Sequence, residues 1–151
     1  MTHETYMRQC LVLAEEAKTW GDVPVGAVVV RSGKVIGRGA NCRTRDLDPS
    51  GHAEIVAMRD AARTLGDWRL TDCTLYVTLE PCMMCAGAMV QARVAMCVYG
   101  CPDSRAGCGG SLLDLGALED AAHQVTMMSG VLQDECALAL QVFFRDVRNK
   151  Q

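Results

Sequence analysis

Residues 73–99 carry the sequence CTLYVTLEPCMMCAGAMVQARVAMCVY, in which two strand-like runs flank a helix-like run. The run from Cys73 to Leu79 alternates and is rich in β-formers, and Val94 to Tyr99 form the second such run. Between them Pro81 stands where the first helical position is expected, and Met83 to Ala92 continue as a helix. Strand, helix and strand with tight connections make a parallel crossover unit, so this region predicts an α/β fold.

The chain before this unit predicts two helices and a β-hairpin. Apolar residues recur at helical spacing from Glu4 to Thr19, and the composition of Ala53 to Leu65 is typical of a second helix. The β-branched runs Val25 to Arg31 and Lys34 to Ala40 are joined by Ser32-Gly33, a short turn able to adopt positive φ. We therefore expect a β-hairpin between two helices.

The chain after this unit predicts a loop, a weak strand and a final helix. Glycine is frequent between Gly100 and Gly110, and a strand and a helix are expected over Gln124 to Met128 and Leu132 to Val147. The 151 residues are about the length of one ordinary domain. We therefore expect residues 1–151 to form a single domain.

The overall charge and the apolar runs exclude several classes of protein. A formal net charge of -3 argues against a strongly basic nucleic-acid binder, so any RNA site has to be a local patch. The apolar run Val23 to Val30 is far shorter than the roughly 20 residues of a membrane helix. Met1 to Cys10 contain no apolar core of a secretory signal. We expect a cytoplasmic protein without a membrane partner.

Nine cysteines, an odd number, favour reduced thiols over a disulfide framework. Five of them lie in apolar stretches and are interpreted as small core residues: Cys10, Cys42, Cys73, Cys97 and Cys136. Cys101 and Cys108 flank the glycine-rich loop, and their pairing as a regulatory disulfide or a second metal site stays open.

His52 and the pair Cys82 and Cys85 form the candidate metal site. Two cysteines three apart at a helix start lie on one face, and the helix N-terminus favours the thiolates that zinc binds. One imidazole and two thiolates leave a tetrahedral zinc ion with a fourth position for water, as in catalytic sites. Zinc lowers the pKa of that water from 15.7 to roughly 7.

Glu54 is the candidate proton shuttle beside this metal. It follows His52 by two residues, which on a regular helix points it to nearly the opposite side. If the metal lies beyond the helix N-terminus and near the axis, first-turn side chains converge on it from different sides. Glu54 would then take a proton from water and return it to the substrate.

A Cys-x-x-Cys pair alone is also typical of redox proteins and of structural zinc sites. A lone His-x-Glu carries little information. The two motifs together, with Pro81 before the first cysteine and no fourth ligand close by, favour a catalytic zinc and resemble the signature of zinc-dependent nucleobase deaminases.

Six segments closely resemble the bacterial tRNA-specific adenosine deaminases, and the match covers nearly the whole chain. They are Pro24-Val25-Gly26-Ala27-Val28, His52-Ala53-Glu54-Ile55, Thr78-Leu79-Glu80-Pro81-Cys82, Cys85-Ala86-Gly87-Ala88-Met89, Gly110-Ser111-Leu112 and Phe143-Phe144-Arg145. The resemblance implies a three-layer α/β/α cytidine-deaminase-like fold with a five-stranded mixed sheet, and a homodimer. It also implies hydrolytic deamination of adenosine to inosine at the wobble position of a tRNA anticodon loop.

The resemblance also implies roles for individual residues. His52, Cys82 and Cys85 would hold one zinc ion per subunit, and Glu54 would move protons. Seven further positions would contact the substrate: Asn41 and the backbone N–H of Ala53 at the purine, and Asp103, Arg105, Phe144, Arg145 and Arg148 at the flanking nucleotides of the anticodon stem-loop. Cys101 and Cys108 depart from what is typical of the family's loop.

Three other functions share parts of this pattern. A deaminase of free guanine, adenine or cytosine compounds would share the zinc site. A zinc-binding module without enzymatic activity would not need the acid at Glu54, and a redox protein would use Cys82 and Cys85 without zinc.

Overall fold

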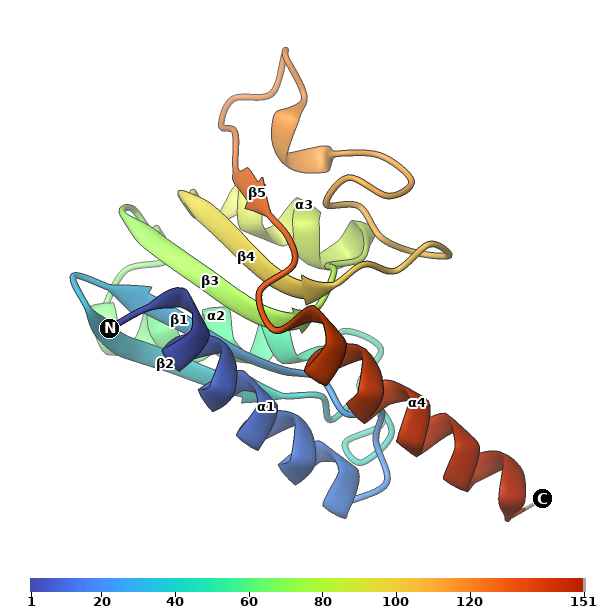
Figure 1. The fold of residues 1–151 in the computed structure, drawn as a ribbon. Coiled ribbons are helices and arrows are strands. Elements are labelled where there is room, and N and C mark those ends of the chain that lie inside the picture. Colours follow the sequence, from blue (N-terminus) through green and yellow to red (C-terminus); the bar gives the residue numbers. More distant parts are fainter. Residues whose placement is uncertain (151) are drawn as a thin grey trace.

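A five-stranded mixed sheet forms the centre of the computed structural model, which describes residues 1–150 (Figure 1). Its strands lie in the order β2-β1-β3-β4-β5. β1 is antiparallel to both β2 and β3, whereas β3, β4 and β5 are parallel. The strand bounds are β1 Gly26–Arg31, β2 Lys34–Ala40, β3 Cys73–Leu79, β4 Met96–Cys101 and β5 Thr126–Met128. The predicted α/β class with a mixed sheet is confirmed.

Helices cover both faces of this sheet and complete three layers (Figure 1). The helix bounds are α1 His3–Thr19, α2 Ala53–Leu65, α3 Met83–Gln91, η1 Leu115–Ala117 (a 3-10 turn) and α4 Gln133–Asn149. Buried residues of α2 and α3 form one core with the sheet, and buried residues of α1 and α4 form the other. The three-layer architecture agrees with the prediction.

Strand side chains divide between the two cores because successive residues of a strand point to opposite faces. On β1, Ala27 and Val29 belong to the core under α2 and α3, whereas Val28 and Val30 belong to the core under α1 and α4. The run is apolar throughout because both faces of the strand are buried.

The α2 helix lies unusually close to β2 because glycine occupies the facing positions of that strand. A Cβ atom at Gly37 would overlap the carbonyl oxygen of Ala57, and one at Gly39 would overlap that of Ala53. The close approach brings the N-terminus of α2 to the end of β2. His52, the residue before α2, is thereby placed at the edge of the sheet.

Several predicted boundaries differ from the observed ones by one or two residues, for example the starts of α3 and β4. α3 begins at Met83 with Cys82 as its N-cap, so Pro81 precedes the helix instead of occupying its first position. The reason is that Cys82 has extended backbone angles, φ -78° and ψ 178°. β4 begins at Met96, two residues later than expected, because Val94 donates its N–H to Met89 in the turn. The 3-10 turn η1 was not predicted.

All nine cysteines lie within residues 1–150, where none forms a disulfide. Cys10, Cys42, Cys73, Cys97 and Cys136 are buried, as predicted for small core residues. Cys101 and Cys108 are also buried, and their thiols donate to the carbonyls of Thr78 and Ala106. No helix within these residues has the length and apolar character required to cross a membrane.

Candidate active site

The N-termini of α2 and α3 meet at the same edge of the sheet. His52 is the N-cap residue of α2 and Cys82 that of α3, and neither side chain caps its own helix. Both side chains are therefore free to turn toward each other. Cys85 stands in the first turn of α3 and is fully buried.

These three side chains form a compact set of metal donors. The His52 Nδ1 atom lies 3.5 Å from the sulfur of Cys82 and 3.5 Å from that of Cys85. All three donor atoms lie within 4.8 Å of one another. One imidazole and two thiols at this spacing suit tetrahedral zinc and leave room for a fourth ligand. The donor set thus fits the ion that the sequence predicts.

Hydrogen bonds within the set favour the thiolate form of Cys82. The Cys85 thiol and the His52 imidazole both stabilise the charged sulfur and lower the pKa of Cys82 to about 3, against an opposing effect of burial. The same contact with Cys82 raises the pKa of His52. The contact with Cys82 and burial raise the pKa of Cys85, so the side chains favour one thiolate, at Cys82, and the thiolate is the form that binds zinc.

Glu54 enters the same site from the first turn of α2. Its carboxyl is only 4% exposed, and burial raises its pKa to about 7. The neighbouring Cys85 side chain offsets part of this rise in the pKa of Glu54. The first-turn side chains of α2 therefore converge from different sides of the helix, as the sequence required.

A cavity of about 500 Å³ opens over these groups. Six of the predicted site residues line it: Asn41, His52, Ala53, Glu54, Cys82 and Asp103. Ala53 is the first residue of α2, so its backbone N–H has no partner within the helix. A base in this cavity would lie within reach of that donor and of Glu54.

Asn41 is held at the cavity by four hydrogen bonds, one of which runs from its backbone N–H to the carbonyl of Val25 at 3.0 Å. Its Nδ2 donates to the carbonyl of Val23 at 3.1 Å, and its Oδ1 accepts from the N–H of Arg43 at 3.2 Å. The indole of Trp20 donates to its backbone carbonyl at 2.9 Å. One amide hydrogen of Asn41 is left for a ligand, since the side chain carries two.

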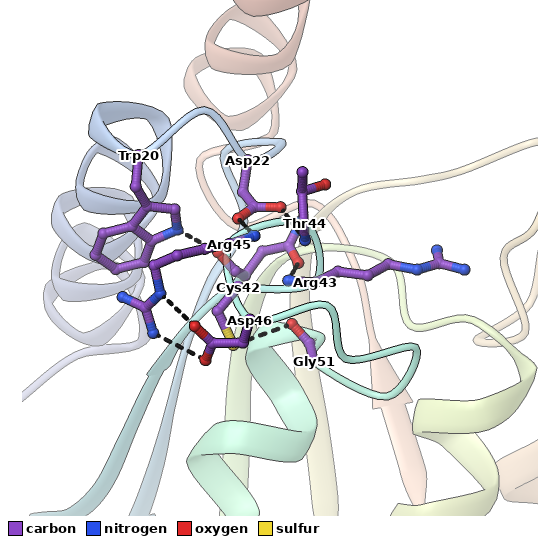
Figure 2. A network of polar contacts seen from close by, with 9 residues as sticks. Trp20, Asp22, Cys42, Arg43, Thr44, Arg45, Asp46 and Gly51 are labelled. Atoms are coloured by element: carbon purple, nitrogen blue, oxygen red, sulfur yellow. Dashed lines mark hydrogen bonds and ion pairs between the residues drawn. The ribbon is translucent and has the colours of Figure 1, made fainter.

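The segment after Asn41 is anchored to the end of α1, as Figure 2 shows. The buried carboxylate of Asp22 accepts from the N–H groups of Thr44 and Arg45 at 2.8 and 3.0 Å. Arg45 stacks on the ring of Trp20 at 4.1 Å and pairs with Asp46 at 2.7 Å. These contacts with the end of α1 therefore hold in place the cavity wall formed by Asn41, Arg43 and Thr44.

A second hollow of about 560 Å³ lies between the glycine-rich loop and α4. Asp103, Arg105, Phe144 and Arg148 all line it, and Asp103 lines the first cavity as well. Phe144 and Arg148 are one turn apart on α4, which places them on one face of the helix.

Arg145 is the predicted site residue that the structure does not bring to this hollow. It lines neither cavity, and its nearest charged partner is Asp146, with Nε and Oδ1 3.7 Å apart. It follows Phe144 by one residue, so it points away from the face that Phe144 and Arg148 share.

Residues 1–101 match the family described as the cytidine and deoxycytidylate deaminase zinc-binding region, and the matched range includes all three metal donors. The chain belongs to the cytidine and deoxycytidylate deaminase family. Within this family it is 45% identical to the tRNA-specific adenosine deaminase of Bacillus subtilis, over 98% of this chain and 92% of that protein. The predicted resemblance is thereby confirmed.

Solved structures of deaminases have the same fold. One, from a study of A-to-I editing by tRNA:A34 deaminases at the wobble position of transfer RNA, superimposes with a TM-score of 0.84 at 40% identity. It covers 90% of this chain and 99% of its own. The guanine deaminase of Bacillus subtilis gives a TM-score of 0.67 at 32% identity, over 99% of this chain and 95% of its own.

The sequence analysis missed two buried acids that line the cavity of this deaminase, Asp22 and Glu80. Burial opposes the ionisation of Glu80, but hydrogen bonds from Ser111, Asp103 and Gly109 outweigh it and lower the pKa of Glu80 below its ordinary value. In the sequence, Glu80 could have been recognised as an acidic residue at the end of an apolar strand, directly before Pro81-Cys82. Asp22 had a similar signal, an acid between the helix stop and the first strand.

Proposed function

We propose that this chain is a zinc-dependent hydrolase that deaminates adenosine to inosine at the wobble position of a tRNA anticodon loop. The proposal depends on one observation. His52, Cys82 and Cys85 form one set of metal donors, and His52, Cys82 and Glu54 line one cavity, in a chain that closely matches the tRNA-specific adenosine deaminase of Bacillus subtilis.

We propose that His52, Cys82 and Cys85 hold one zinc ion per chain. The 3.5 Å separations of their donor atoms support this assignment. When bound at such a site, zinc lowers the pKa of a water molecule to roughly 7 and so supplies a nucleophile at neutral pH.

Glu54 acts as the proton carrier in this proposal. Its buried carboxylate takes a proton from the attacking water and delivers it to the ring nitrogen next to C6 of adenine. Glu54 then takes the remaining proton from the new hydroxyl group on C6 and delivers it to the amino group as the C6–N bond breaks. Water and adenosine thereby give inosine and ammonia, and Glu54 returns to its starting form.

The purine is held by groups at the rim of the cavity. Asn41 offers its remaining amide hydrogen and Ala53 its backbone N–H. Both groups are rigid, because Asn41 is tied to Val23 and Arg43 and Ala53 begins a helix. To reach them, the target base has to leave the stack of its loop.

The nucleotides that flank the target base are assigned to the second hollow. Arg105 and Arg148 offer positive charge to phosphates there, and Phe144 offers an exposed ring for stacking. We keep Arg145 as a phosphate contact, which it can make from the outer side of α4. Asp103 stands where the two hollows share a wall.

We also propose a homodimer. α3 packs against η1, and exposed apolar side chains lie on α3 and on the segments beside η1: Met83, Met84, Leu112, Leu113 and Leu118. A patch of such side chains is typical of a protein interface. Met83, which is 67% exposed, is the natural position to test it. Met83→Asp is expected to give a monomer in light scattering, and a variant that stays dimeric would contradict this assignment.

Residues 1–151 act in this proposal as a single catalytic domain in the cytoplasm. The nine free thiols support a reducing compartment. No membrane partner is required.

The test is inosine formation on an anticodon stem-loop, measured beside free adenosine, guanine and cytidine. The stem-loop is expected to react far faster than the free compounds, and Glu54→Gln serves as the inactive control. Equal or better turnover of free guanine would favour the second candidate, a free-base deaminase, which the 32% identity to a guanine deaminase brings forward. Zinc without ammonia release from any substrate would indicate a non-enzymatic module.

A further inference from the structure

Glu80 is a buried carboxylate that the proposed mechanism leaves unused. It follows the last residue of β3 and is 3% exposed. Its backbone N–H is committed to the sheet, where it donates to the carbonyl of Cys101 at 2.9 Å. A charge at such a position requires partners, because burying an unpaired carboxylate is costly.

The hydrogen-bond partners of the Glu80 side chain all come from one loop, residues 102–111. Its Oε1 accepts from the N–H of Asp103 at 2.9 Å, and its Oε2 accepts from those of Gly109 and Ser111 at 2.9 and 3.0 Å. The Ser111 hydroxyl donates to Oε1 as well. Four donors from both ends of the 102–111 loop therefore converge on one side chain, and hydrogen bonds to a charged acceptor are the stronger kind.

The loop fits closely around this carboxylate. A Cβ atom at Gly107 would overlap the Glu80 carboxylate and the carbonyl of Asp103. A neighbouring contact strengthens the arrangement, since the N–H of Cys108 donates to the carbonyl of Pro81 at 2.8 Å. The loop is thus attached to the segment that runs directly into the metal donor Cys82.

This loop forms the outer wall of both hollows. Asp103 and Ala106 line the catalytic cavity, and Asp103 and Arg105 line the hollow beside α4. The Asp103 side chain also caps the turn, because its Oδ1 accepts from the N–H groups of Arg105 and Ala106 at 3.0 and 3.3 Å. Glu80 holds the N–H of the same aspartate, so it fixes the start of this wall.

We propose that Glu80 is a positioning residue that keeps the 102–111 loop in the shape required to receive the target nucleotide and its neighbour. The inference rests on the proposed function, since it assigns the loop to the substrate. Glu80 touches neither the reacting atoms nor the metal donors in this proposal. Glu80 also lines the catalytic cavity, but both of its carboxylate oxygens are bonded to the loop, so its effect reaches the substrate through Asp103, Arg105 and Ala106.

Positioning of this kind has a distinct kinetic signature. If the loop is ordered only part of the time, apparent affinity falls by the fraction that is competent to bind. Once the substrate is bound the wall is in place, so the chemical step proceeds at its normal rate. Loss of Glu80 should therefore raise KM and leave kcat nearly unchanged.

Glu80→Gln is the direct test, because it keeps the size of the side chain but removes the charge and replaces one acceptor by a donor. KM for an anticodon stem-loop is expected to rise by roughly tenfold or more, as when charge-assisted hydrogen bonds are weakened. Glu15→Gln, on the exposed face of α1, is the matched control and should behave as wild type. Zinc content and melting temperature are measured on each variant.

Two further variants disturb the same contact from the loop. Ser111→Ala removes one of the four donors and should show a smaller rise in KM. Gly107→Ala places a methyl group against the carboxylate and should act in the same direction as Glu80→Gln. The double variant Glu80→Gln/Gly107→Ala should raise KM by clearly less than the two single effects combined if both substitutions act through one contact.

Hydrogen exchange supplies a readout that does not depend on turnover. The amide hydrogens of Asp103, Gly109 and Ser111 should exchange at least about tenfold faster in Glu80→Gln, because they lose a charged acceptor. Unchanged exchange in a folded, zinc-loaded Glu80→Gln would overturn the inference, as would a fall in kcat at constant KM. A wild-type chain that makes no inosine from the stem-loop would overturn the proposed function instead, and the exchange data would still decide whether Glu80 anchors the loop.

Discussion

The Nδ1 atom of His52 lies 3.5 Å from the sulfur of Cys82, although 30 positions separate the two residues in the chain. Each is the residue immediately before a helix, and the two helices pack on the same face of the sheet. The candidate metal site is therefore assembled by the packing of α2 and α3 on the sheet, and its geometry depends on this packing as much as on the donor residues.

Cys82→Ala should lose both zinc and turnover. An imidazole and one sulfur leave too few donors to hold zinc at a tetrahedral site. Zinc content by elemental analysis and inosine formation are measured together. Cys73→Ala is the matched control, because this buried cysteine on β3 faces the core and should keep its zinc. A Cys82→Ala chain with a full complement of zinc would contradict the ligand assignment.

Glu54→Gln should keep its zinc and lose turnover by about 10²-fold to 10⁴-fold, the usual contribution of a positioned proton carrier. Glutamine has nearly the same shape, so the cavity remains filled but no proton can be carried. The comparison with Cys82→Ala separates the base from the ligands. Near-normal turnover in Glu54→Gln would end the assignment of Glu54 as the proton carrier.

Gly37→Ala should destabilise the fold by about 1–3 kcal/mol, because the added methyl group overlaps the α2 backbone and forces a packing shift. The free energy of unfolding in urea measures this loss. Arg38→Ala, at the neighbouring exposed position of β2, should change it by no more than about 0.5 kcal/mol. Equal stability of the two variants would show that α2 tolerates displacement from β2.

Arg148→Ala should weaken binding of the stem-loop and reduce the steepness of its salt dependence by about one unit on a log-log plot. Phe144→Ala should weaken binding without that change in slope, because a ring contributes by stacking. Fluorescence anisotropy at several salt concentrations distinguishes the two. Arg63→Ala on α2, in the other helical layer, is the control. Identical slopes for Arg148→Ala and wild type would remove Arg148 from the phosphate contacts.

The fold was largely predictable because its signals are local. The alternation of Cys73–Leu79, the turn at Ser32-Gly33 and the stop at Gly66 each act within a few residues. The displaced start of β4 was not predictable, because it depends on hydrogen bonds made after Ala92. Helix α3 likewise starts two residues later than a proline rule suggests, since Cys82 is the N-cap.

The site was predictable where chemistry restricts residue type and was missed where an ordinary residue acts through packing. The candidate metal donors and their acid are recognisable because the His-x-Glu and Pro-Cys-x-x-Cys motifs occur together. Glu80 is an acid among many in the sequence, and its importance comes from backbone N–H groups some 23 to 31 positions away. Arg145 is a different case. The Phe143-Phe144-Arg145 motif predicts which segment contacts the substrate, but only the geometry of the helix determines which residues of that segment face the hollow.

X-ray absorption at the zinc edge of the purified chain tests the central claim most directly. The account predicts one zinc ion with two sulfur ligands at about 2.3 Å and two nitrogen or oxygen ligands at about 2.0–2.2 Å, one of them from His52. Loss of one sulfur ligand from this shell in Cys85→Ser would assign that ligand to Cys85. A shell of four protein ligands, or one without sulfur, would contradict the account.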